Sequence, residues 1–531
     1  MGVAEPIILA VDLGTSGCKC ALVTLDGRVL GWAFRAVELH IEGVSAEQDP
    51  QDWWRAFLTT AGELLSRETS WRARVVAVCC STQGEGTIPV DRAGEPLGPA
   101  IVWLDMRGAT SIARRARGKL VNIEGYSPGK LLRWLRLTGG APALSGKDSA
   151  GHMTWLLDAQ PSVYDRTFKF LNVLDYMNLR LTGRFCATPD SILTSWVTDN
   201  RDVNQVRYDA GLIAQLGIDA DKLPDIVGST EVLGPLLPTI AEQLGLQPGI
   251  QVVAGSIDNS AVAVGSGAIS DFDVHLYMGT SSWLGAHVPF KKTDLANRIA
   301  SVPCAIGGRY LAMAMQSSGG ANLTFLRDRI LFHADELTGD EQRQSFYDTL
   351  DYFAQRSPAG ARGLVYTPWL FGERTPVDDT SLRAGLINLS LEHSREDIIR
   401  AFLEGVALNT RWMLEPFTRF VGKRPPAVTM VGGGAQSDHW CQIMADVTGC
   451  AVRQPEAPIQ ANALGAAFIG AAGIGALSLR ESSTLQRIRR IYEPNKTHRA
   501  LYEERFGTFR EIHRRLRPLY RRLNPPRQSA A

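Results

Sequence analysis

The sequence lacks the patterns that mark secreted, membrane-spanning and metal-bound proteins. Its eight cysteines include no C-x-x-C pair, and Cys18, Cys20, Cys79 and Cys80 lie in apolar β-like runs, where a thiol behaves as a small hydrophobic side chain. No apolar run approaches the length that crosses a membrane, and the short run near the N-terminus lacks the basic start of a signal peptide. We therefore expect a cytoplasmic protein with reduced cysteines and no membrane attachment.

An excess of charge of either sign is also missing. The chain has 56 lysines and arginines against 55 aspartates and glutamates, which gives a net charge of +1. So small a net charge produces no field that would recruit nucleic acid or a membrane surface. We expect a small-molecule partner, and we expect no nucleic acid.

Two common nucleotide-binding fingerprints are absent. Gly-Lys pairs end at Lys119, Lys130, Lys147 and Lys423, but none is followed by Ser or Thr, so no P-loop motif occurs. No G-x-G-x-x-G sequence occurs either, which removes the mark of a Rossmann dinucleotide site. A nucleotide, if bound, must be held in another way.

What the chain does contain is a repeated hairpin pattern. An apolar strand from Ile7 runs into Asp12 and the turn Gly14-Thr15-Ser16, and a second apolar strand runs into the turn Gly279-Thr280-Ser281. Such a repeat indicates internal duplication, and backbone N–H groups in these turns suit phosphate. With 531 residues, the chain exceeds one hydrophobic core. We predict an α/β protein with two actin-like, or ribonuclease H-like, domains around a nucleotide cleft, covering residues 1–255 and 256–531.

Asp258 is the candidate for a general base. It follows the apolar run from Val252, opens a helical segment and is followed by Asn259, so it should lie at a strand-to-helix corner. Ligands of α/β proteins bind at such corners, where the first helical turn offers unpaired N–H groups. An aspartate that only caps its helix is the alternative.

The loop after the buried strand near residues 74–80 is a candidate binding site for a polyhydroxylated ligand. It contains Gln83, Gly84 and Glu85, and a predicted hairpin of residues 88–90 and 100–103 would bring Trp103, Asp105 and Arg107 to the same place. Aromatic rings contact C–H faces while polar groups bind hydroxyls. A buried tryptophan beside a surface ion pair, with Glu85 in water or paired with Arg107, is the alternative.

A glycine run provides the candidate site for a nucleotide base. The strand before Val431 leads directly into Gly432, Gly433, Gly434 and Ala435. Residues without side chains let a flat ring approach the backbone closely. The small-residue helix at 463–467 would suit close packing beneath such a pocket.

In combination, these motifs resemble the FGGY family of carbohydrate kinases, xylulokinase-like members in particular. The likeness runs from Leu9 to about residue 475 and also includes Glu47-Gln48-Asp49-Pro50, Ile101-Val102-Trp103, Asp258-Asn259 and Gly372-Glu373-Arg374-Thr375-Pro376. The resemblance implies transfer of the γ-phosphoryl group of ATP, bound with Mg²⁺, to a hydroxyl of a small sugar or polyol. It leaves a homodimer open as the oligomeric state.

The resemblance also implies a role for each motif. Asp258 would be the catalytic base, and Asp12 would organise Mg²⁺, directly or through water. The turns at Gly14, Thr15 and Ser16 and at Gly279, Thr280 and Ser281 would hold phosphate, while Gly432 to Ala435 would contact adenine and ribose. The acceptor would contact Gln83, Gly84, Glu85, Trp103, Asp105, Asp258 and Asn259.

One departure from the family pattern bears on the substrate. Xylulokinases usually carry a histidine in the loop where this chain has Gln83-Gly84-Glu85-Gly86. A glutamate accepts hydrogen bonds from hydroxyls but cannot donate to a carbonyl oxygen. The acceptor could thus be a ketopentose such as xylulose or a polyol. The alternative to a carbohydrate kinase is a protein of another functional class, namely an actin-like ATPase, filament protein or chaperone that has no sugar substrate.

Overall fold

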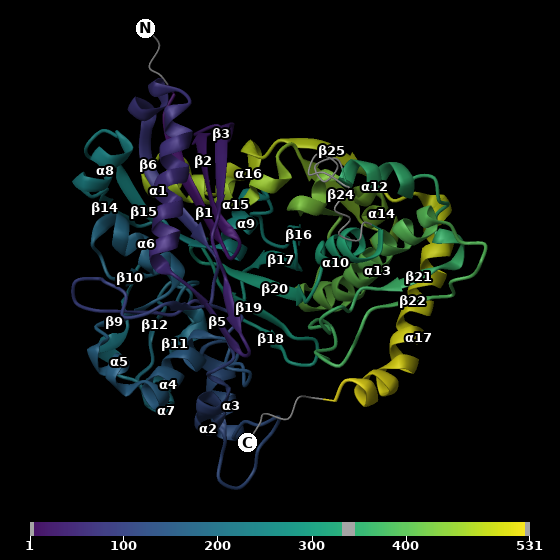
Figure 1. Cartoon of the computed structure of the whole chain (residues 1–531), viewed down its shortest axis with the longest axis horizontal. Helices are drawn as coiled ribbons and strands as arrows, with labels where there is room; N and C mark the ends of the chain where they lie inside the picture. The colour runs from purple at the N-terminus through teal and green to yellow at the C-terminus, as the bar shows by residue number, and fades with distance from the viewer. Residues whose placement is uncertain (1–4, 332–345, 526–531) are drawn as a thin grey trace.

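The computed structural model describes residues 5–331 and 346–525, and it has two halves, each built on one large sheet (Figure 1). The first sheet has the order β14-β15-β6-β1-β2-β3. Its strands are β1 (Ile7–Gly14), β2 (Gly17–Thr24), β3 (Val29–Ala36), β6 (Val75–Thr82), β14 (Val232–Pro235) and β15 (Gln251–Ile257).

The second sheet has the order β18-β19-β20-β17-β16-β23-β24-β25. Its strands are β16 (Val274–Met278), β17 (Ser282–Val288), β18 (Thr293–Asp294), β19 (Ile299–Pro303), β20 (Tyr310–Gln316), β23 (Ala427–Val431), β24 (Ala451–Pro455) and β25 (Ile488–Tyr492). Short strands outside both sheets are β4 (His40–Glu42), β5 (Ser45–Gln48), β7 (Ile88–Val90), β8 (Ala100–Ile101), β9 (Lys169–Leu171), β10 (Cys186–Ala187), β11 (Thr198–Asp199), β12 (Arg207–Tyr208), β13 (Asp225–Ile226), β21 (Val365–Thr367) and β22 (Gly385–Ile387).

The two sheets share one topology. In the first, β1 and β2 form an antiparallel hairpin, β6 pairs in parallel with β1, and β15 pairs in parallel with β6. In the second, β16 and β17 form the hairpin, β23 pairs in parallel with β16, and β24 pairs in parallel with β23. The predicted duplication and the two-domain α/β fold are therefore confirmed.

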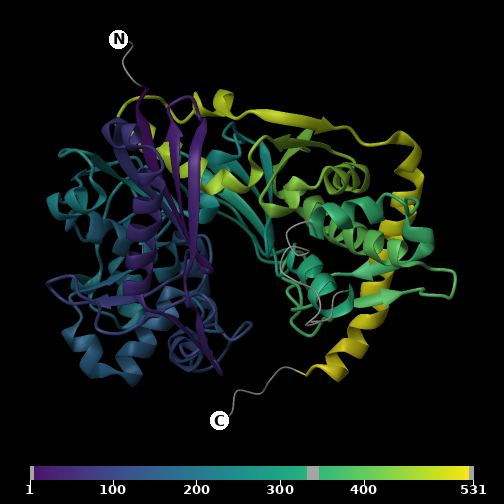
Figure 2. The same cartoon turned by 45° about the horizontal axis from the view of Figure 1, so that its top comes forward.

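Helices surround both sheets. Those of the first half of the chain are α1 (Pro50–Ser66), α2 (Ala109–Ala116), α3 (Pro128–Leu137), α4 (Ser149–Ala159), α5 (Pro161–Arg166), α6 (Val173–Thr182), α7 (Ala210–Leu216), α8 (Pro238–Leu244) and α9 (Asp258–Gly265). Those of the second half are α10 (Ala321–Leu326), α12 (Phe346–Ala354), α13 (Arg395–Val421), α14 (Asp438–Thr448), α15 (Ala461–Gly473), α16 (Ser482–Leu485) and α17 (Arg499–Leu523). Figure 2 shows α17 along the outer side of the second half.

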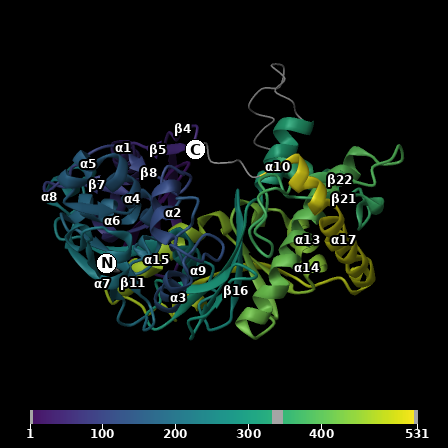
Figure 3. The same ribbon diagram turned by 90° about the horizontal axis from the view of Figure 1, so that it is seen from below.

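Two helices, α9 and α15, connect the halves (Figure 3). A Cβ added at Gly465 of α15 would lie 1.9 Å from the Ala261 carbonyl oxygen of α9, so the two backbones are in direct contact. Buried Ala467 and Phe468 of α15 pack against the first sheet, although they belong to the second half of the sequence. Helix α9 contacts strands of both sheets, so its contacts do not assign it to one domain. The domain boundary near residue 255 therefore remains our proposal.

The hairpin predicted for residues 88–90 and 100–103 is present only in an irregular form. Strand β7 pairs with β9, and β8 pairs with β5. The chain between residues 87 and 101 folds back on itself through isolated antiparallel bridges, Thr87 with Ile101 and Val90 with Pro96. Short segments of this kind take their partners from tertiary packing, which local sequence does not specify.

Among the described residues, no helix is long and apolar enough to cross a membrane. All eight cysteines are free and buried.

Candidate active site

Asp258 lies at the predicted strand-to-helix corner. Strand β15 ends at Ile257, and Asp258 is the first residue of α9. The Ile257 N–H donates to Asp190 Oδ2 at 3.2 Å, and the Asn259 N–H donates to Asp258 Oδ1 at 2.7 Å. The buried Asp190 therefore holds the backbone just before Asp258.

The surroundings of Asp258 suit proton transfer. Burial raises the pKa of Asp258 to about 7, and the nearby carboxylates of Asp12, Glu85 and Asp190 add to this effect. A general base works best when its pKa lies close to the operating pH. The pKa of Asp258 thus favours a role as proton acceptor.

Asp12 lies at the end of β1 beside a lysine that the sequence analysis did not select. Lys19 Nζ lies 3.3 Å from Asp12 Oδ2 and donates to the Ile459 carbonyl oxygen at 3.1 Å. Burial raises the pKa of the Asp12 carboxyl, and Lys19 opposes that rise. Because Asp12 and Lys19 are direct partners in the β1–β2 register, the predicted hairpin could have revealed this pair.

Unpartnered polar atoms gather around Asp12, as expected of a site for phosphate and a metal ion. Asp12, Ser81 and Ser256 are in register across β1, β6 and β15. Their end of the parallel strands is where α/β proteins bind ligands. Among the described residues, buried polar atoms without a protein partner include Ser81 Oγ, Ser256 Oγ, Asn462 Oδ1 and both ends of the Gln460 amide.

The groups around Asp12 suit a magnesium ion that is bound together with phosphates. They do not suit a metal ion that is held by protein ligands alone. No group of three or more His, Cys, Asp or Glu side chains that could hold a metal occurs in the described part of the chain. Magnesium in phosphoryl-transfer sites is commonly held by one or two carboxylates together with phosphates and water. Asp12 supplies such a carboxylate, and Lys19 adds a cation for phosphate.

A hydrogen-bond network joins the first turn to the Gln83 loop. Thr15 Oγ1 donates to Gln83 Oε1 at 2.7 Å, and Trp103 Nε1 donates to Thr15 Oγ1 at 2.9 Å. Gln83 Nε2 donates to Gln48 Oε1 at 2.8 Å. The structure thus brings together Thr15, Gln83 and Trp103, and it adds Gln48, which sequence reasoning had assigned no role. Because both ends of its buried amide are used, Gln83 fixes the loop.

Asp105 has a different environment from the one expected. Its oxygens accept hydrogen bonds from the Ala46 N–H, the Arg107 N–H and Arg107 Nε at 2.8 to 2.9 Å, and its exposed fraction is 1%. Arg107 also pairs with Glu47 at 2.5 Å. Asp105 is therefore a buried partner of Arg107, and its contact with the acceptor stays a prediction.

Glu85 adopts a strained backbone conformation. It has a φ of 61°, which is uncommon for a residue with a side chain. Burial raises the pKa of its carboxyl, while the charges of Arg374 and Lys147 oppose that rise. The charges of two cations that the sequence analysis did not assign to the site, one from each half of the chain, therefore act on the Glu85 carboxyl. Arg107 pairs with Glu47 and Asp105 instead of with Glu85.

Two further glycines hold the turn at Gly279, Thr280 and Ser281. The Gly320 N–H donates to the Gly279 carbonyl oxygen at 2.7 Å, and the Gly319 N–H donates to the Thr280 carbonyl oxygen at 2.9 Å. A Cβ at Gly320 would lie 2.8 Å from the Gly279 oxygen. This close approach explains why residue 320 is a glycine. The hairpin pattern in the sequence could not have indicated this contact.

The three glycines after β23 have different surroundings. A Cβ at Gly432 would lie 2.7 Å from the Met278 carbonyl oxygen, and one at Gly434 would lie 2.4 Å from Met278 Cγ. A Cβ at Gly433 would meet nothing within 4 Å. The Ala435 carbonyl oxygen accepts from Gln454 Nε2 at 2.8 Å, which fixes the turn. Gly433 therefore presents bare backbone to open space.

We expect Gly433→Val to weaken ATP binding without unfolding the protein. The new side chain has room in the protein but would occupy the space proposed for adenine, so the KM for ATP should rise about tenfold or more. The KM for the acceptor and the melting temperature should stay unchanged, as steady-state kinetics and thermal unfolding would show. Gly434→Val is the matched control and should destabilise the fold. Unchanged ATP kinetics in Gly433→Val would refute an adenine position here.

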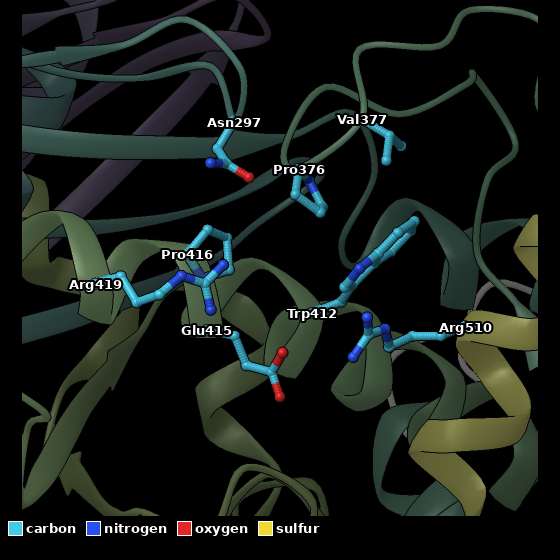
Figure 4. Close-up of a pocket in the computed structure, with 8 residues that line it drawn as sticks. All are labelled: Asn297, Pro376, Val377, Trp412, Glu415, Pro416, Arg419 and Arg510. Carbon is cyan, nitrogen blue, oxygen red and sulfur yellow. The ribbon is translucent and has the colours of Figure 1, made fainter.

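A cavity of about 310 Å³ lies on the second half, away from these residues (Figure 4). Figure 4 shows Pro376 and Val377 opposite Trp412 and Glu415, with Arg419 and Arg510 at its sides. None of the predicted site residues lines this cavity. It borders the loop that carries Arg374, since Pro376 follows two residues later.

The comparisons with known proteins identify the family. Residues 7–265 match the N-terminal domain of the FGGY family of carbohydrate kinases, and residues 274–474 match its C-terminal domain. The chain belongs to the FGGY family. It is a carbohydrate kinase, an enzyme that transfers phosphate to an alcohol group.

Relatives of this FGGY kinase act on more than one acceptor. A xylulose kinase from Bacillus subtilis is 27% identical over 95% of this chain and 96% of its own length, and a gluconokinase from the same organism is 26% identical over 87% and 86%. The structure of a gluconate kinase from Lactobacillus acidophilus superposes with a TM-score of 0.83 at 24% identity, covering 98% of this chain and 100% of that one. The fold is thus shared by kinases named for a ketose and for a sugar acid.

Proposed function

We propose that this FGGY kinase transfers the γ-phosphoryl group of ATP to a hydroxyl of a small sugar or polyol, with Asp258 as the catalytic base. The observation that carries the proposal is the position of Asp258 directly after β15, where the charges of Asp12 and Glu85 act on its carboxyl and its pKa is raised to about 7. A base next to a phosphate-and-metal site and to an acceptor loop is what phosphoryl transfer to an alcohol requires.

Each part of the site has a role in this reaction. The acceptor oxygen attacks the γ-phosphorus, its proton passes to Asp258, and the bond to the β–γ bridging oxygen breaks to release ADP. Magnesium, when bound, offsets the negative charge of the phosphates. Asp12 and Lys19 would hold the metal and phosphates together with the turns Gly14 to Ser16 and Gly279 to Ser281. Gly433 and its neighbours would hold the adenine.

The acceptor would lie on the first half of the chain, against Gly84, Glu85 and Trp103, with Asn259 beside the base. The relatives named for xylulose support a ketopentose, whereas Glu85 in place of the xylulokinase histidine supports a ligand that offers hydroxyls. An ATPase without a sugar substrate has no support in the family match.

A coupled assay of ADP release tests the proposal. Ketopentoses, pentitols, tetritols and glycerol would each be added with MgATP, and at least one should raise the rate of ADP formation well above the rate in water. Identification of the phosphorylated product by mass spectrometry would complete the test. ADP formation that no acceptor accelerates would refute sugar phosphorylation and support an acceptor-independent ATPase.

We expect Glu85→Gly to separate function from stability. Glycine adopts the φ of 61° without strain, so the free energy of unfolding should be unchanged or higher by up to about 1 kcal/mol. Loss of the carboxylate should lower kcat/KM for the best acceptor about 10- to 100-fold, with the KM for ATP unchanged. Chemical denaturation and steady-state kinetics measure the two effects. A stability loss with normal acceptor kinetics would instead make Glu85 structural.

A further inference from the structure

The hairpin of β16 and β17 carries an aromatic pair where the hairpin of β1 and β2 carries Asp12 and Lys19. Each hairpin turns at a Gly-Thr-Ser sequence, and Tyr277 stands two residues before that glycine, as Asp12 does. Asp12 is opposite Lys19 in the first register, and Tyr277 is opposite Trp283 in the second. The duplication therefore puts Tyr277 at the position that corresponds to Asp12.

The two aromatic rings are stacked beside the turn of their hairpin. The ring centroids of Tyr277 and Trp283 lie 3.9 Å apart, and the ring planes differ by 15°. A Cβ added at Gly279 would lie 2.7 Å from the Tyr277 hydroxyl oxygen. The phenol end of Tyr277 thus lies directly against the backbone of a turn whose N–H groups suit phosphate.

Both members of the pair carry a hydrogen-bond donor without an acceptor. Trp283 is 5% exposed, and its buried Nε1 has no partner among the described residues. The hydroxyl of the partly buried Tyr277 makes no hydrogen bond with any residue that the structure describes. By contrast, the hydroxyls of Tyr126, Tyr208 and Tyr310 each donate to a backbone carbonyl oxygen. Buried polar groups are normally paired, so two adjacent unpaired donors indicate a bound acceptor.

Helix α9 joins the aromatic pair to the proposed base. Trp283 lies in one cluster of buried side chains with Val262 of α9, and Tyr277 packs against this cluster. Val262 comes four residues after Asp258, so the two lie one turn apart on the same face of the helix. Burial and the charges of Asp12 and Asp258 raise the pKa of the Tyr277 hydroxyl, which therefore stays protonated and can donate.

The segment before α15 joins the aromatic pair to Lys19. Ala461, the first residue of α15, lies in the same cluster as Trp283. Two residues earlier, the Ile459 carbonyl oxygen accepts a hydrogen bond from Lys19 Nζ at 3.1 Å. One short segment, residues 459–461, therefore contacts both hairpins, and the two pairs are neighbours.

The alternation of side chains along β16 separates the aromatic pair from the proposed adenine position. Met278 packs in the core of the second half, where a Cβ added at Gly434 would collide with its side chain. Tyr277 comes one residue earlier and points to the opposite face of the sheet, toward α9. The Tyr277 hydroxyl is therefore on the side of Asp258, where the reacting end of the nucleotide would lie.

We infer that the Tyr277 hydroxyl donates a hydrogen bond to the γ-phosphoryl group of ATP and that Trp283 holds the Tyr277 ring in position. The inference rests on the proposed function and adds a residue that contacts the transferred group. The hydrogen bond fixes the phosphoryl group against the turn at Gly279, while Lys19 offsets its charge. Tyr277 is thus a substrate-binding residue, and Trp283 is a positioning residue.

Nucleotide binding tests the inference separately from the transfer reaction. Tyr277→Phe keeps the ring and its stack but removes the hydroxyl, so affinity for a non-hydrolysable ATP analogue should fall about 10- to 100-fold, as expected for a hydrogen bond to a charged group. Affinity for ADP, which lacks the γ-phosphoryl group, should stay unchanged. Calorimetric titration of the full-length protein with each nucleotide and Mg²⁺ measures both affinities. In the coupled assay, kcat/KM for ATP should fall by the same factor.

Variants of Trp283 test the positioning role. Trp283→Leu loses the stack and should reduce the preference for the ATP analogue over ADP about tenfold, whereas Trp283→Phe keeps a ring against Tyr277 and should retain more of it. A merely structural role would lower the melting temperature without changing this preference. Tyr208→Phe is the matched control, because the Tyr208 hydroxyl already donates to the Pro224 carbonyl oxygen at 2.7 Å, and it should leave both affinities unchanged. Thermal unfolding checks that each variant is folded.

Three results would overturn the inference. Unchanged affinity of Tyr277→Phe for the ATP analogue would show that the hydroxyl contacts no phosphate. An equal loss of affinity for the analogue and for ADP would place the contact on the α- or β-phosphate. A change confined to the KM for the acceptor would place the hydroxyl in the acceptor site. Failure of the proposed function gives a different result, since the hydroxyl-dependent preference for the analogue would persist while no acceptor raised the rate of ADP formation.

Discussion

Asp258→Asn should lower kcat about 10²- to 10⁴-fold while ATP still binds with nearly its wild-type affinity, because a positioned general base is worth about that much. Asparagine keeps the size of the side chain, but it cannot take the proton from the acceptor hydroxyl. Rapid-quench kinetics would measure the transfer step, and calorimetric titration with an ATP analogue would measure binding.

The pH dependence of kcat/KM in the wild-type enzyme provides the control for Asp258→Asn. With a pKa raised to about 7, the Asp258 carboxyl is protonated below that value, so kcat/KM should fall tenfold per pH unit below the midpoint and level off above it. Bound magnesium would move the midpoint below 7, because a nearby cation favours the charged form. Asp258→Asn should abolish this part of the profile. Normal turnover with about 1 kcal/mol lower stability would show that Asp258 only caps α9.

Gly465→Val should destabilise the protein by about 3 kcal/mol, at the upper end of the usual range for overpacking, because its side chain would collide with backbone and not with a movable side chain. The added Cβ would lie 1.9 Å from the Ala261 carbonyl oxygen. On the other helix, a Cβ at Gly265 would lie 1.8 Å from the Ala461 carbonyl oxygen. The two helices would have to separate, and Asp258 at the start of α9 would move with them. Denaturant unfolding and kcat measure the two effects.

A glycine elsewhere offers the matched control. Gly507 lies in α17, and a Cβ there would meet nothing within 4 Å. Gly507→Ala should stabilise the protein by about 0.5 to 1 kcal/mol, because alanine favours a helix more than glycine does. Gly465→Ala should have the opposite sign. If both alanine variants were equally stable, the contact between α9 and α15 would not limit residue size.

The sequence predicted those parts of the site that depend on neighbouring residues. The strand before Asp258 and the helix after it are recognisable from a short window, and the structure places Asp258 at that corner. The hairpin from Ile7 to Thr24 was predicted for the same reason. The roles of the site residues stay predictions.

Other parts of the site required contacts between distant segments. Gln48 contacts Gln83, and the cations whose charges act on Glu85 come from residues 147 and 374. In the sequence, Lys147 followed by Asp148 was only a failed P-loop match, and Arg374 was one letter of a family motif. The additional strand partners of β7 and β8 have the same origin, since β9 and β5 lie far from them along the chain.

The sequence by itself therefore determined the family, the duplicated α/β plan and the corner that carries Asp258, because strand periodicity, glycine turns and helix starts are set by local backbone preferences. Only the tertiary structure decided which charges act on Glu85, which glycine faces open space and how α15 crosses α9. Those relations depend on the packing of segments hundreds of residues apart, where burial and steric fit outweigh local preference.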